Sequence, residues 1–568
     1  MKGKDHRPVR RARWMRRILV GLFTSSFVIT MLCCAASWYI DYRGIARPPA
    51  LTRLAPILDE RLEEVDGVRR IGDNWLAQRD GLMYMSLAGD PFTLGYANGA
   101  LTQPFLREQE QMMLDLVRSK FSAPWKMWLL KKYVTWRDRD LPGFVPLEYQ
   151  LEIFGLSTGG GLSSSVFGPT YHVVLNCHAA HDISHMVMDH PLVGCTSFAA
   201  WGEYTAGGNL LLGRNFDWQA GECFDRNKIV VRVTPEEGIG FVSVSWPGMA
   251  GVVSGMNRER IAVAVNAAQS SVRPEIGVPV SILIREVLQR ATTLEEAVQM
   301  VRDSQVFVSD SYLIADGKSR RAVVVEKTPA ASAIREPGEP MIICANHFLT
   351  RPLRDDPANR AYQTEGTSVE RYERMEALVR EAKGQLTAER TALILRDRRI
   401  RGLPSPVIGH PAAVNCLGAT HSVIMDVTAG VVWVSNYPHQ LGEYIPFQVE
   451  RFDERPDAAA IPADPILADG SYERCRQASA LIAEGRRLHE AGAAETARSR
   501  FALAAELNPD HYEPWMHLGR IAFEEKRLDD ARRLLERALS LRPAFESERL
   551  AIQGMLERTP PSSGIPGT

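Results

Sequence analysis

An uncharged run of 23 residues, from Ile18 to Ile40, constrains the chain more than any other feature. As an α-helix it would measure about 35 Å, enough to cross a hydrocarbon core of about 30 Å. Basic residues crowd the positions before it, and such flanks stay in the cytoplasm. The pattern predicts a basic cytoplasmic tail over residues 1–17 and a single-pass membrane anchor over residues 18–40. The rest of the chain would then lie on the exported, periplasmic or extracellular side.

A cleaved signal peptide is the alternative to an anchor. Small residues suited to a signal peptidase follow Cys34, at Ala35, Ala36 and Ser37. The apolar run is, however, longer than the roughly 7 to 15 residues of an ordinary signal sequence. We therefore favour an uncleaved anchor.

The whole chain is too long for one hydrophobic core. Its 568 residues correspond to roughly three or four domains. With 67 basic and 68 acidic side chains the net charge is near zero, which argues against nucleic acid as a partner. Of the 8 cysteines, six lie outside the apolar run, too few for a disulfide framework in a chain of this length.

The expected secondary structure changes along the chain. The pattern of residues 41–194 predicts a helical, propeptide-like segment. Residues 195–452 instead combine short β-rich runs with groups of helices. A stretch rich in Pro, Ala and Asp over residues 453–470 is typical of a linker. Because strands and helices come in groups rather than in strict alternation, we expect a layered α+β fold for the central part.

The last part of the chain contains an internal repeat over residues 471–556. Five residues recur at an offset of 34, which is the tetratricopeptide period: Gly485, Ala497, Ala504, Leu507 and Pro509 return as Gly519, Ala531, Ala538, Leu541 and Pro543. Two such repeats are fewer than the three usually needed for independent stability. We expect them to pack on the main domain or on another copy, and to serve either as a surface for a protein partner or as a structural cap.

Other patterns suggest weaker hypotheses. A Trp- and Lys-rich segment over residues 123–136 suits either a membrane surface or, as we favour, a helix packed on the core. His178, His181 and His185 have a spacing that would place three imidazoles near one helix face, yet no metalloprotease signature accompanies them. The Gly/Ser-rich stretch over residues 157–165 lacks the pattern of a nucleotide-binding loop. We expect neither a metal nor a cofactor.

Cys195 is the candidate nucleophile. It follows the small Gly194 and begins a strand-like run, so its thiol has access to the Gly194 carbonyl for an N-to-S acyl shift. Cleavage there would make Cys195 an N-terminus. Its α-amine would have a pKa of about 7.7 to 8.0, suited to act as general base for its own thiol. The alternative is an inert buried cysteine, the commoner fate of an isolated cysteine.

Four downstream residues strengthen this interpretation. Arg214 and Asp217 end a second strand-like run, where a guanidinium can stabilise a thiolate and a carboxylate can face an α-ammonium group. Asn266 and Asn346 each end another such run, and asparagine can donate a hydrogen bond to an oxyanion. Asparagine is also an ordinary turn residue, so neither carries the argument alone.

The run Gly194-Cys195-Thr196-Ser197 and the run Gly213-Arg214-Asn215-Phe216-Asp217 resemble motifs of the cysteine N-terminal-nucleophile hydrolases. This group includes penicillin acyltransferase, choloylglycine hydrolases and acid ceramidase. The resemblance implies an αββα sandwich, self-cleavage at Gly194-Cys195, and oxyanion roles for Asn266 and Asn346. It also implies that Arg371, in the run Ser368 to Tyr372, is a second site arginine.

The resemblance further implies the activity. We expect a membrane-anchored, exported amidohydrolase or acyltransferase that acts on linear N-acyl amide bonds and forms a thioester on Cys195. Anchoring favours small acylated substrates of lipid-like character. His347 and His421 have no role in this scheme, so they either shape an acyl pocket or are core histidines. The alternative function is a catalytically degenerate envelope scaffold that binds protein partners through the repeats.

Overall fold

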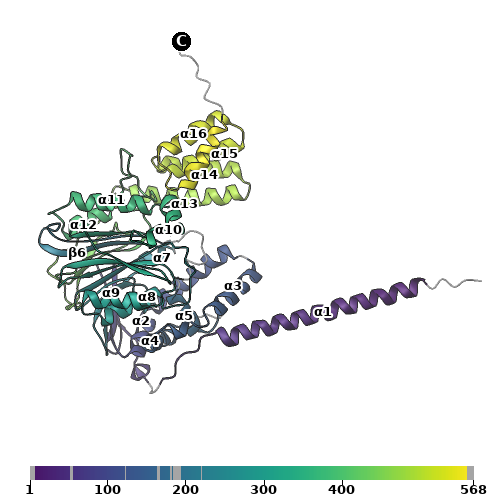
Figure 1. Cartoon of the computed structure of the whole chain (residues 1–568), viewed down its shortest axis with the longest axis horizontal. Helices are drawn as coiled ribbons and strands as arrows, with labels where there is room; N and C mark the ends of the chain where they lie inside the picture. Colours follow the sequence, from purple (N-terminus) through teal and green to yellow (C-terminus); the bar gives the residue numbers. More distant parts are fainter. Residues whose placement is uncertain are drawn as a thin grey trace, which may run out of the picture.

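The computed structural model describes residues 7–51, 55–121, 123–162, 167–179, 182, 193–218 and 221–559. Figure 1 shows a layered body from which helix α1 projects on one side, with a helical unit near the C-terminus packed on another. The strands form two sheets, and most of the helices cover their outer faces.

The larger sheet has eleven strands within the described residues, in the spatial order β1-β2-β3-β4-β7-β8-β9-β10-β11-β12-β13. Its pairing is antiparallel except where β4 lies parallel to β7. The strands are β1 (Glu63–Val65), β2 (Val68–Ile71), β3 (Asn74–Arg79), β4 (Leu82–Gly89), β7 (Ile229–Pro235), β8 (Phe241–Ser245), β9 (Ser254–Asn257), β10 (Ile261–Ala267), β11 (Asp310–Asp316), β12 (Arg321–Lys327) and β13 (Ser332–Arg335).

The smaller sheet contains the candidate nucleophile. Its six strands follow the order β14-β5-β6-β15-β16-β17, and all pair antiparallel. They are β14 (Met341–Cys344), β5 (Val193–Gly202), β6 (Gly208–Trp218), β15 (Ala419–Asp426), β16 (Val431–Ser435) and β17 (Tyr444–Gln448). Almost all of their side chains are buried because both faces of the sheet are covered.

The described residues include sixteen α-helices: α1 projects from the body, and the others cover the sheets or build the C-terminal unit. They are α1 (Arg7–Gly44), α2 (Pro91–Lys120), α3 (Pro124–Arg137), α4 (Leu147–Gly159), α5 (Thr170–His178), α7 (Glu222–Arg226), α8 (Val280–Arg290), α9 (Leu294–Asp303), α10 (Pro357–Glu365), α11 (Ser368–Glu381), α12 (Ala388–Leu395), α13 (Ser471–Glu490), α14 (Ala494–Leu507), α15 (Tyr512–Glu524), α16 (Leu528–Ser540) and α17 (Glu546–Glu557).

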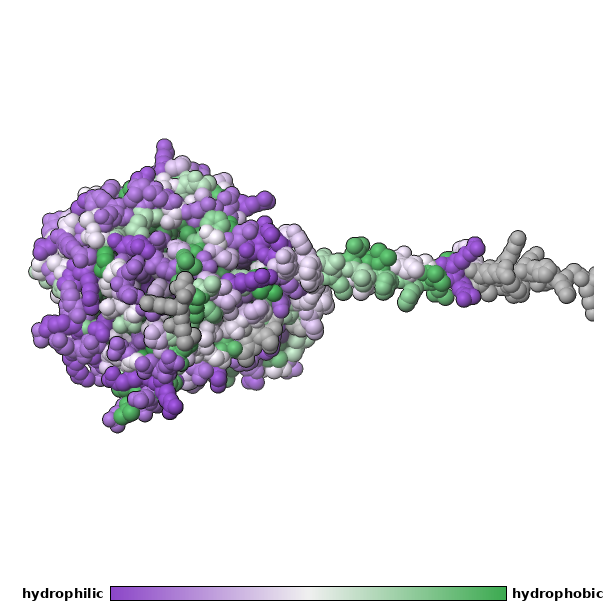
Figure 2. Space-filling view, turned by 90° about the horizontal axis from the view of Figure 1, so that it is seen from below, coloured by the Kyte–Doolittle hydropathy of each residue, from purple (hydrophilic) through white to green (hydrophobic). Residues whose placement is uncertain are grey.

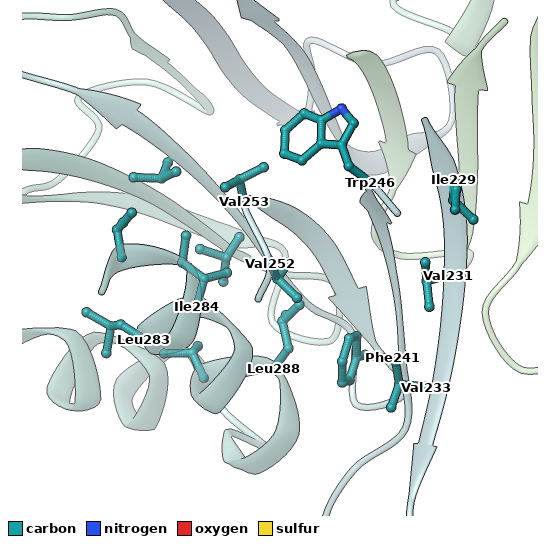
Figure 3. Packing of buried hydrophobic residues seen from close by; sticks show 14 of the residues in the cluster. Ile229, Val231, Val233, Phe241, Trp246, Val252, Val253, Leu283, Ile284 and Leu288 are labelled. Carbon is teal, nitrogen blue, oxygen red and sulfur yellow. The ribbon is translucent and has the colours of Figure 1, made fainter. Parts of the chain in front are cut away.

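Three apolar cores hold the layers together. One lies between the two sheets and joins residues such as Val244 and Val423. A second joins the larger sheet to α8 and α9, where Leu283 and Ile284 face the strands (Figure 3). The third joins the smaller sheet to α11 and α12. The predicted αββα arrangement is therefore confirmed, and it follows from apolar residues on both faces of each sheet.

The expectation of helix throughout the upstream segment is wrong for residues 63–89. These residues form β1 to β4 and extend the larger sheet. Asp66-Gly67 joins β1 to β2 and Asp80-Gly81 joins β3 to β4, and all four residues have positive φ, as two-residue hairpin turns require. Strand β4 also pairs in parallel with β7, about 140 residues further along the chain. The segment before Cys195 is thus built into the same sheet as the segment after it.

Helices α2 and α4 pack unusually closely in this upstream part. A Cβ atom added to Gly95 would lie 1.7 Å from the carbonyl oxygen of Glu152, and one added to Gly155 would lie 2.1 Å from that of Phe92. Glycine is therefore required at the crossing for the backbones to approach. This helix pair forms a wall of the cavity described below.

The C-terminal repeats form two helix pairs, α13 with α14 and α15 with α16, followed by α17. They pack on the main domain, where Asn508 donates to the carbonyl of Ile408 at 3.1 Å. The His410 ring also lies 2.9 Å from the carbonyl of Arg542. This contact supplies the neighbouring surface that two repeats need.

Candidate active site

The pairing of β5 with β6 places the candidate residues. Cys195 lies opposite Phe216, Ser197 opposite Arg214, and Gly194 opposite Asp217. Because side chains alternate along a strand, Cys195 and Arg214 share the face that looks toward the larger sheet. Asp217 lies on the other face, beside the backbone of the Gly194–Cys195 bond.

Arg214 is completely buried and binds the sulfur. Its Nη2 atom donates to Cys195 Sγ at 3.6 Å, and its Nη1 atom donates to the carbonyl of Val253 at 2.6 Å. Further donation to Ser254 Oγ and to the carbonyl of Val265 fixes the guanidinium. Its plane also lies 4.5 Å from the centre of the Phe216 ring. These contacts compensate for burying the charge and aim it at the thiol.

Asn346 and Arg371 hold the backbone of Cys195. The Cys195 nitrogen donates to Asn346 Oδ1 at 2.9 Å. Arg371 donates to the Cys195 carbonyl and to Asn346 Oδ1, each at 2.8 Å. Arg371 comes from α11 and Asn346 follows β14, so separate elements meet at one residue. The structure therefore brings both residues to Cys195.

Asn266 approaches from β10 of the larger sheet and contacts Ser197 and Cys344 rather than Cys195 itself. Its Oδ1 accepts from Ser197 Oγ at 3.0 Å, and its Nδ2 donates to the carbonyl of Cys344 at 3.2 Å. The Nδ2 group of Asn346 likewise donates to the carbonyl of Ala267 at 2.9 Å. In this uncleaved chain both predicted oxyanion donors are engaged with backbone carbonyls.

Asp217 is a buried carboxyl group with little stabilisation. Neither of its oxygens has a partner at ordinary hydrogen-bond geometry among the described residues. Burial raises the pKa of Asp217 to about 7, against the opposing charges of Arg371 and Arg214 and the weak thiol donor of Cys416. The group is therefore poised to change its charge near neutral pH.

The Cys195 thiol is protonated in this environment. Burial raises its pKa above the ordinary value, while the charge and hydrogen bond of Arg214 act in the opposite direction. A buried neutral thiol needs a base before it can act as a nucleophile. In this structure Gly194 and Cys195 are joined within β5.

His421 and His347 contact the serines that in turn hold Arg214 and Asn346. His421 Nε2 lies 2.9 Å from Ser254 Oγ, and its ring stacks on Phe216 at 5.1 Å. His347 Nδ1 lies 2.7 Å from Ser368 Oγ, which also accepts from the Asn346 nitrogen. Burial lowers the pKa of both imidazoles. They are core histidines rather than pocket walls.

Sequence reasoning missed Ser254, Ser368 and Cys416. The two serines support Arg214 and Asn346, and the Cys416 thiol lies beside Asp217. Ser254 begins a strand, Ser368 begins a helix and Cys416 lies in a loop, and a serine or cysteine at such positions has no distinctive pattern. These contacts become visible only when distant segments are brought together.

An apolar cavity of about 280 Å³ adjoins the site. Phe216, Trp218, Trp246 and Val253 form the wall nearest Cys195 and Arg214. The opposite wall comes from upstream helices and includes Leu106, Met113, Val117, Leu156 and Val174. The segment before Cys195 thus contributes to the cavity.

The proposed zinc ligands are only partly described. Both ring nitrogens of His178 contact the backbone, Nδ1 with the Val174 carbonyl at 2.8 Å and Nε2 with the Ala250 nitrogen at 2.9 Å. His181 and His185 lie outside the described residues. Within the part of the chain that the structure covers, no group of three or more His, Cys, Asp or Glu residues is arranged to hold a metal ion.

The pKa of Asp217 predicts a pH dependence of stability. Because the folded chain holds this proton more tightly than the unfolded chain does, the stabilisation is complete below about pH 4 and is lost as pH rises to about 7. In uncleaved Cys195→Ala protein, the free energy of unfolding should fall with rising pH over this range. Adding Asp217→Asn should reduce the slope of that fall by up to about 1.4 kcal/mol per pH unit. Urea unfolding at several pH values measures it, and parallel profiles for the two proteins would contradict the assignment.

Two parts of the chain match known protein families. Residues 204–404 match the family model of acyl-coenzyme A:6-aminopenicillanic acid acyl-transferase, and residues 488–555 match a tetratricopeptide-repeat family. The first match begins just after Cys195 and includes Arg214, Asp217, Asn266, Asn346 and Arg371.

Three curated relatives are similar over part of their length. An uncharacterized protein of Archaeoglobus fulgidus is 25% identical over 55% of this chain and 57% of its own length. The N-acylethanolamine-hydrolyzing acid amidase of Caenorhabditis elegans is 26% identical over 36% of this chain and 58% of its own. Protein dcd1B of Dictyostelium discoideum is 22% identical over 38% of this chain and 44% of its own length. The chain thus spans about half the length of the curated relatives it matches.

Solved structures align with part of the chain at low sequence identity. An N-acylethanolamine-hydrolyzing acid amidase ortholog from Caenorhabditis elegans aligns with a TM-score of 0.31 and 19% identity, over 41% of this chain and 93% of that one. A conjugated bile acid hydrolase from Clostridium perfringens aligns with a TM-score of 0.33 and 14% identity, over 46% of this chain and 95% of that one. The family model, together with the repeat match, confirms that the central part of the chain resembles the penicillin acyltransferase branch of the N-terminal-nucleophile enzymes and that tetratricopeptide repeats follow it.

Proposed function

We propose that the chain is a cysteine amidohydrolase or acyltransferase that attacks linear N-acyl amides with Cys195. The family match supports action on amide bonds. The observation that carries the proposal is the convergence on Cys195: Arg214 contacts its sulfur, Asn346 its nitrogen and Arg371 its carbonyl. An inert core cysteine has no need of two buried arginines.

Maturation would begin with attack of Cys195 Sγ on the Gly194 carbonyl carbon. The C–N bond breaks, the thiol proton passes to the departing nitrogen, and a thioester joins Gly194 to Cys195. Water then hydrolyses the thioester, which leaves a carboxylate on Gly194 and a free thiol and α-amine on Cys195. The upstream fragment would stay bound because its strand β4 pairs with β7.

The mature site would carry out acyl transfer with the same residue. The α-amine of Cys195 takes the thiol proton, and the sulfur attacks the amide carbonyl of the substrate. The amine product leaves with that proton, and the acyl group stays on sulfur as a thioester until water or another nucleophile accepts it. Arg214 would favour the thiolate, and Asp217 and Asn346 would orient the α-amine.

Oxyanion stabilisation is the role we propose for Asn266 and Asn346. Cleavage after Gly194 frees one end of β5, and the amide groups now bound to the carbonyls of Cys344 and Ala267 lie beside that end. A side-chain amide that turns toward the substrate carbonyl would donate to the developing negative charge.

The apolar cavity favours substrates with a hydrocarbon acyl chain. Its walls are formed largely by Leu, Val, Met and aromatic side chains, among them Phe216, which lies opposite Cys195 in the sheet. A curated relative is named as an N-acylethanolamine-hydrolyzing amidase, and we extend this substrate class to the chain as part of the proposal.

The first test is hydrolysis of N-acylethanolamines that differ in acyl length. We expect a long acyl chain to be cleaved faster than acetyl, because only the long chain fills the cavity. Cys195→Ala should lose activity by roughly 10⁴-fold or more, whereas Cys34→Ala, in exposed α1, should not. Release of ethanolamine measures both. Full activity of Cys195→Ala, or cleavage of small polar amides alone, would contradict the proposal.

Membrane attachment through α1 is also part of the proposal. The helix has a candidate span over Trp14–Gly44 with none of its apolar window buried in the body. Figure 2 shows this apolar helix standing clear of a largely hydrophilic surface. The length and position suit a single-pass anchor with the enzyme on the exported side.

Helix α3 supports this placement. One face exposes apolar and aromatic side chains at helical spacing: Trp125, Trp128, Leu129, Tyr133 and Trp136. The helix is fixed to the end of α1, because Lys132 pairs with Asp41 and the Trp136 ring lies 5.9 Å from Tyr39. Aromatic side chains beside a span are typical of the membrane interface, so we propose that this face lies on the bilayer.

Photo-activated lipid in vesicles that hold the full chain tests this arrangement. We expect label on α1 and on the peptide over residues 124–137, because both would contact lipid. The matched control is Leu393 on α12, which is also exposed but lies far from α1. Mass spectrometry of the labelled peptides gives the result. Label on α1 without α3 would contradict the surface contact, and no label on α1 would contradict the anchor.

A further inference from the structure

The loop between α12 and β15, residues 396–418, joins the repeats to the candidate site. We call it the site loop. Its middle is held by the repeats: Asn508 donates to the Ile408 carbonyl at 3.1 Å, and His410 Nε2 lies 2.9 Å from the Arg542 carbonyl. His410 is almost fully buried, and its ring lies 5.4 Å from that of Tyr512. The repeats therefore bury this part of the loop.

The far end of the same loop contacts the site. The Val414 carbonyl accepts a hydrogen bond from Asn215 Nδ2 at 3.1 Å, and the backbone nitrogen of Trp218 donates to the Gly418 carbonyl at 3.0 Å. Between them, the Cys416 thiol lies beside the Asp217 carboxyl group. Asn215, Asp217 and Trp218 all belong to the end of β6, so the loop covers Asp217 and excludes water from it.

A second connection runs through the helix that carries Arg371. Glu370, the residue before Arg371, lies with its carboxylate 3.7 Å from the guanidinium of Arg542 in the repeats. The same carboxylate accepts a hydrogen bond from the backbone nitrogen of Arg401, in the site loop, at 3.2 Å. One turn on, Arg374 forms a two-pronged ion pair with Asp397 in the site loop, at 2.9 Å for each contact. Loop, repeats and α11 are thus one connected unit.

We propose that the tetratricopeptide pair positions the catalytic groups, with His410 and Asn508 as positioning residues that hold the site loop over Asp217 and α11 against Cys195. The inference rests on the proposed function and extends it, because it makes self-cleavage depend on repeats that touch no reacting atom. A protein that binds the repeats and displaces the loop would change the activity of the enzyme.

The charged and titratable groups that face Asp217 are Arg371 on α11, Arg214 on β6, Cys195 on β5 and Cys416 on the site loop. Releasing the loop would remove Cys416 and admit water. The carboxyl group would then be hydrated, and its titration would move toward its ordinary acidic range.

The test compares His410→Ala and Asn508→Ala in the full chain with the control His489→Ala. His489 lies in the same repeats but contacts Glu524 instead of the main domain. We expect both interface variants to produce the fragment that begins at Cys195 on the order of tenfold more slowly, since small displacements of reacting groups are costly. The pH midpoint of that reaction should fall, and the control should behave as wild type.

A second readout does not depend on catalysis. In uncleaved Cys195→Ala protein, alkylation of Cys416 should be on the order of tenfold faster with either interface variant, because the thiol loses its cover. Unchanged alkylation would overturn the inference. Faster alkylation with wild-type cleavage would overturn the positioning role. If wild type never cleaves, the proposed function fails and the positioning claim falls with it.

Discussion

The antiparallel pairing of β5 with β6 is the constraint on which the site depends. If β6 slipped by one residue against β5, Arg214 would turn away from the larger sheet while Cys195 still faced it, and Asp217 would turn toward that sheet. The pairing is held by two apolar cores on opposite faces, so register is fixed by the same packing that stabilises the fold. The candidate site residues of β5 and β6 therefore lie on strands packed on both faces, which suits a site that needs well-defined placement.

Two buried arginines and one buried carboxyl group are costly in such a core. Arg214 and Arg371 offset that cost by donating to several backbone and side-chain acceptors each. Asp217 has no comparable set of donors, and its pKa is raised to about 7 as a result. Cleavage at Gly194 would place an α-ammonium group beside this carboxyl group. In the proposed self-cleavage, the new α-ammonium group would supply the positive charge that Asp217 lacks at close range.

Much of this could be predicted from local sequence. Cys195, Arg214 and Asp217 lie in neighbouring strand-like runs, and the repeat period of 34 residues is explicit. Asn346 is indicated by its place at the end of a strand-like run and Arg371 by motif resemblance, and both contact Cys195. The hairpins over residues 63–89 have a local signal that the helical prediction overlooks, because Asp66-Gly67 and Asp80-Gly81 are typical two-residue turns. The pairing of β4 with β7 could not be predicted, because β7 is distant in the chain. The cover that Cys416 gives Asp217 depends on how the loop folds against the repeats, which no local pattern encodes.

The central claim is that Cys195 cuts its own chain and then carries the acyl group. Intact-mass and N-terminal analysis of the purified protein tests it most directly. The account predicts two chains that remain together, the second beginning with Cys195, and a single chain for Cys195→Ala. A wild-type protein that stays intact, with no labelling of Cys195 by a thiol-reactive acyl analogue, would contradict the account and favour a non-catalytic scaffold.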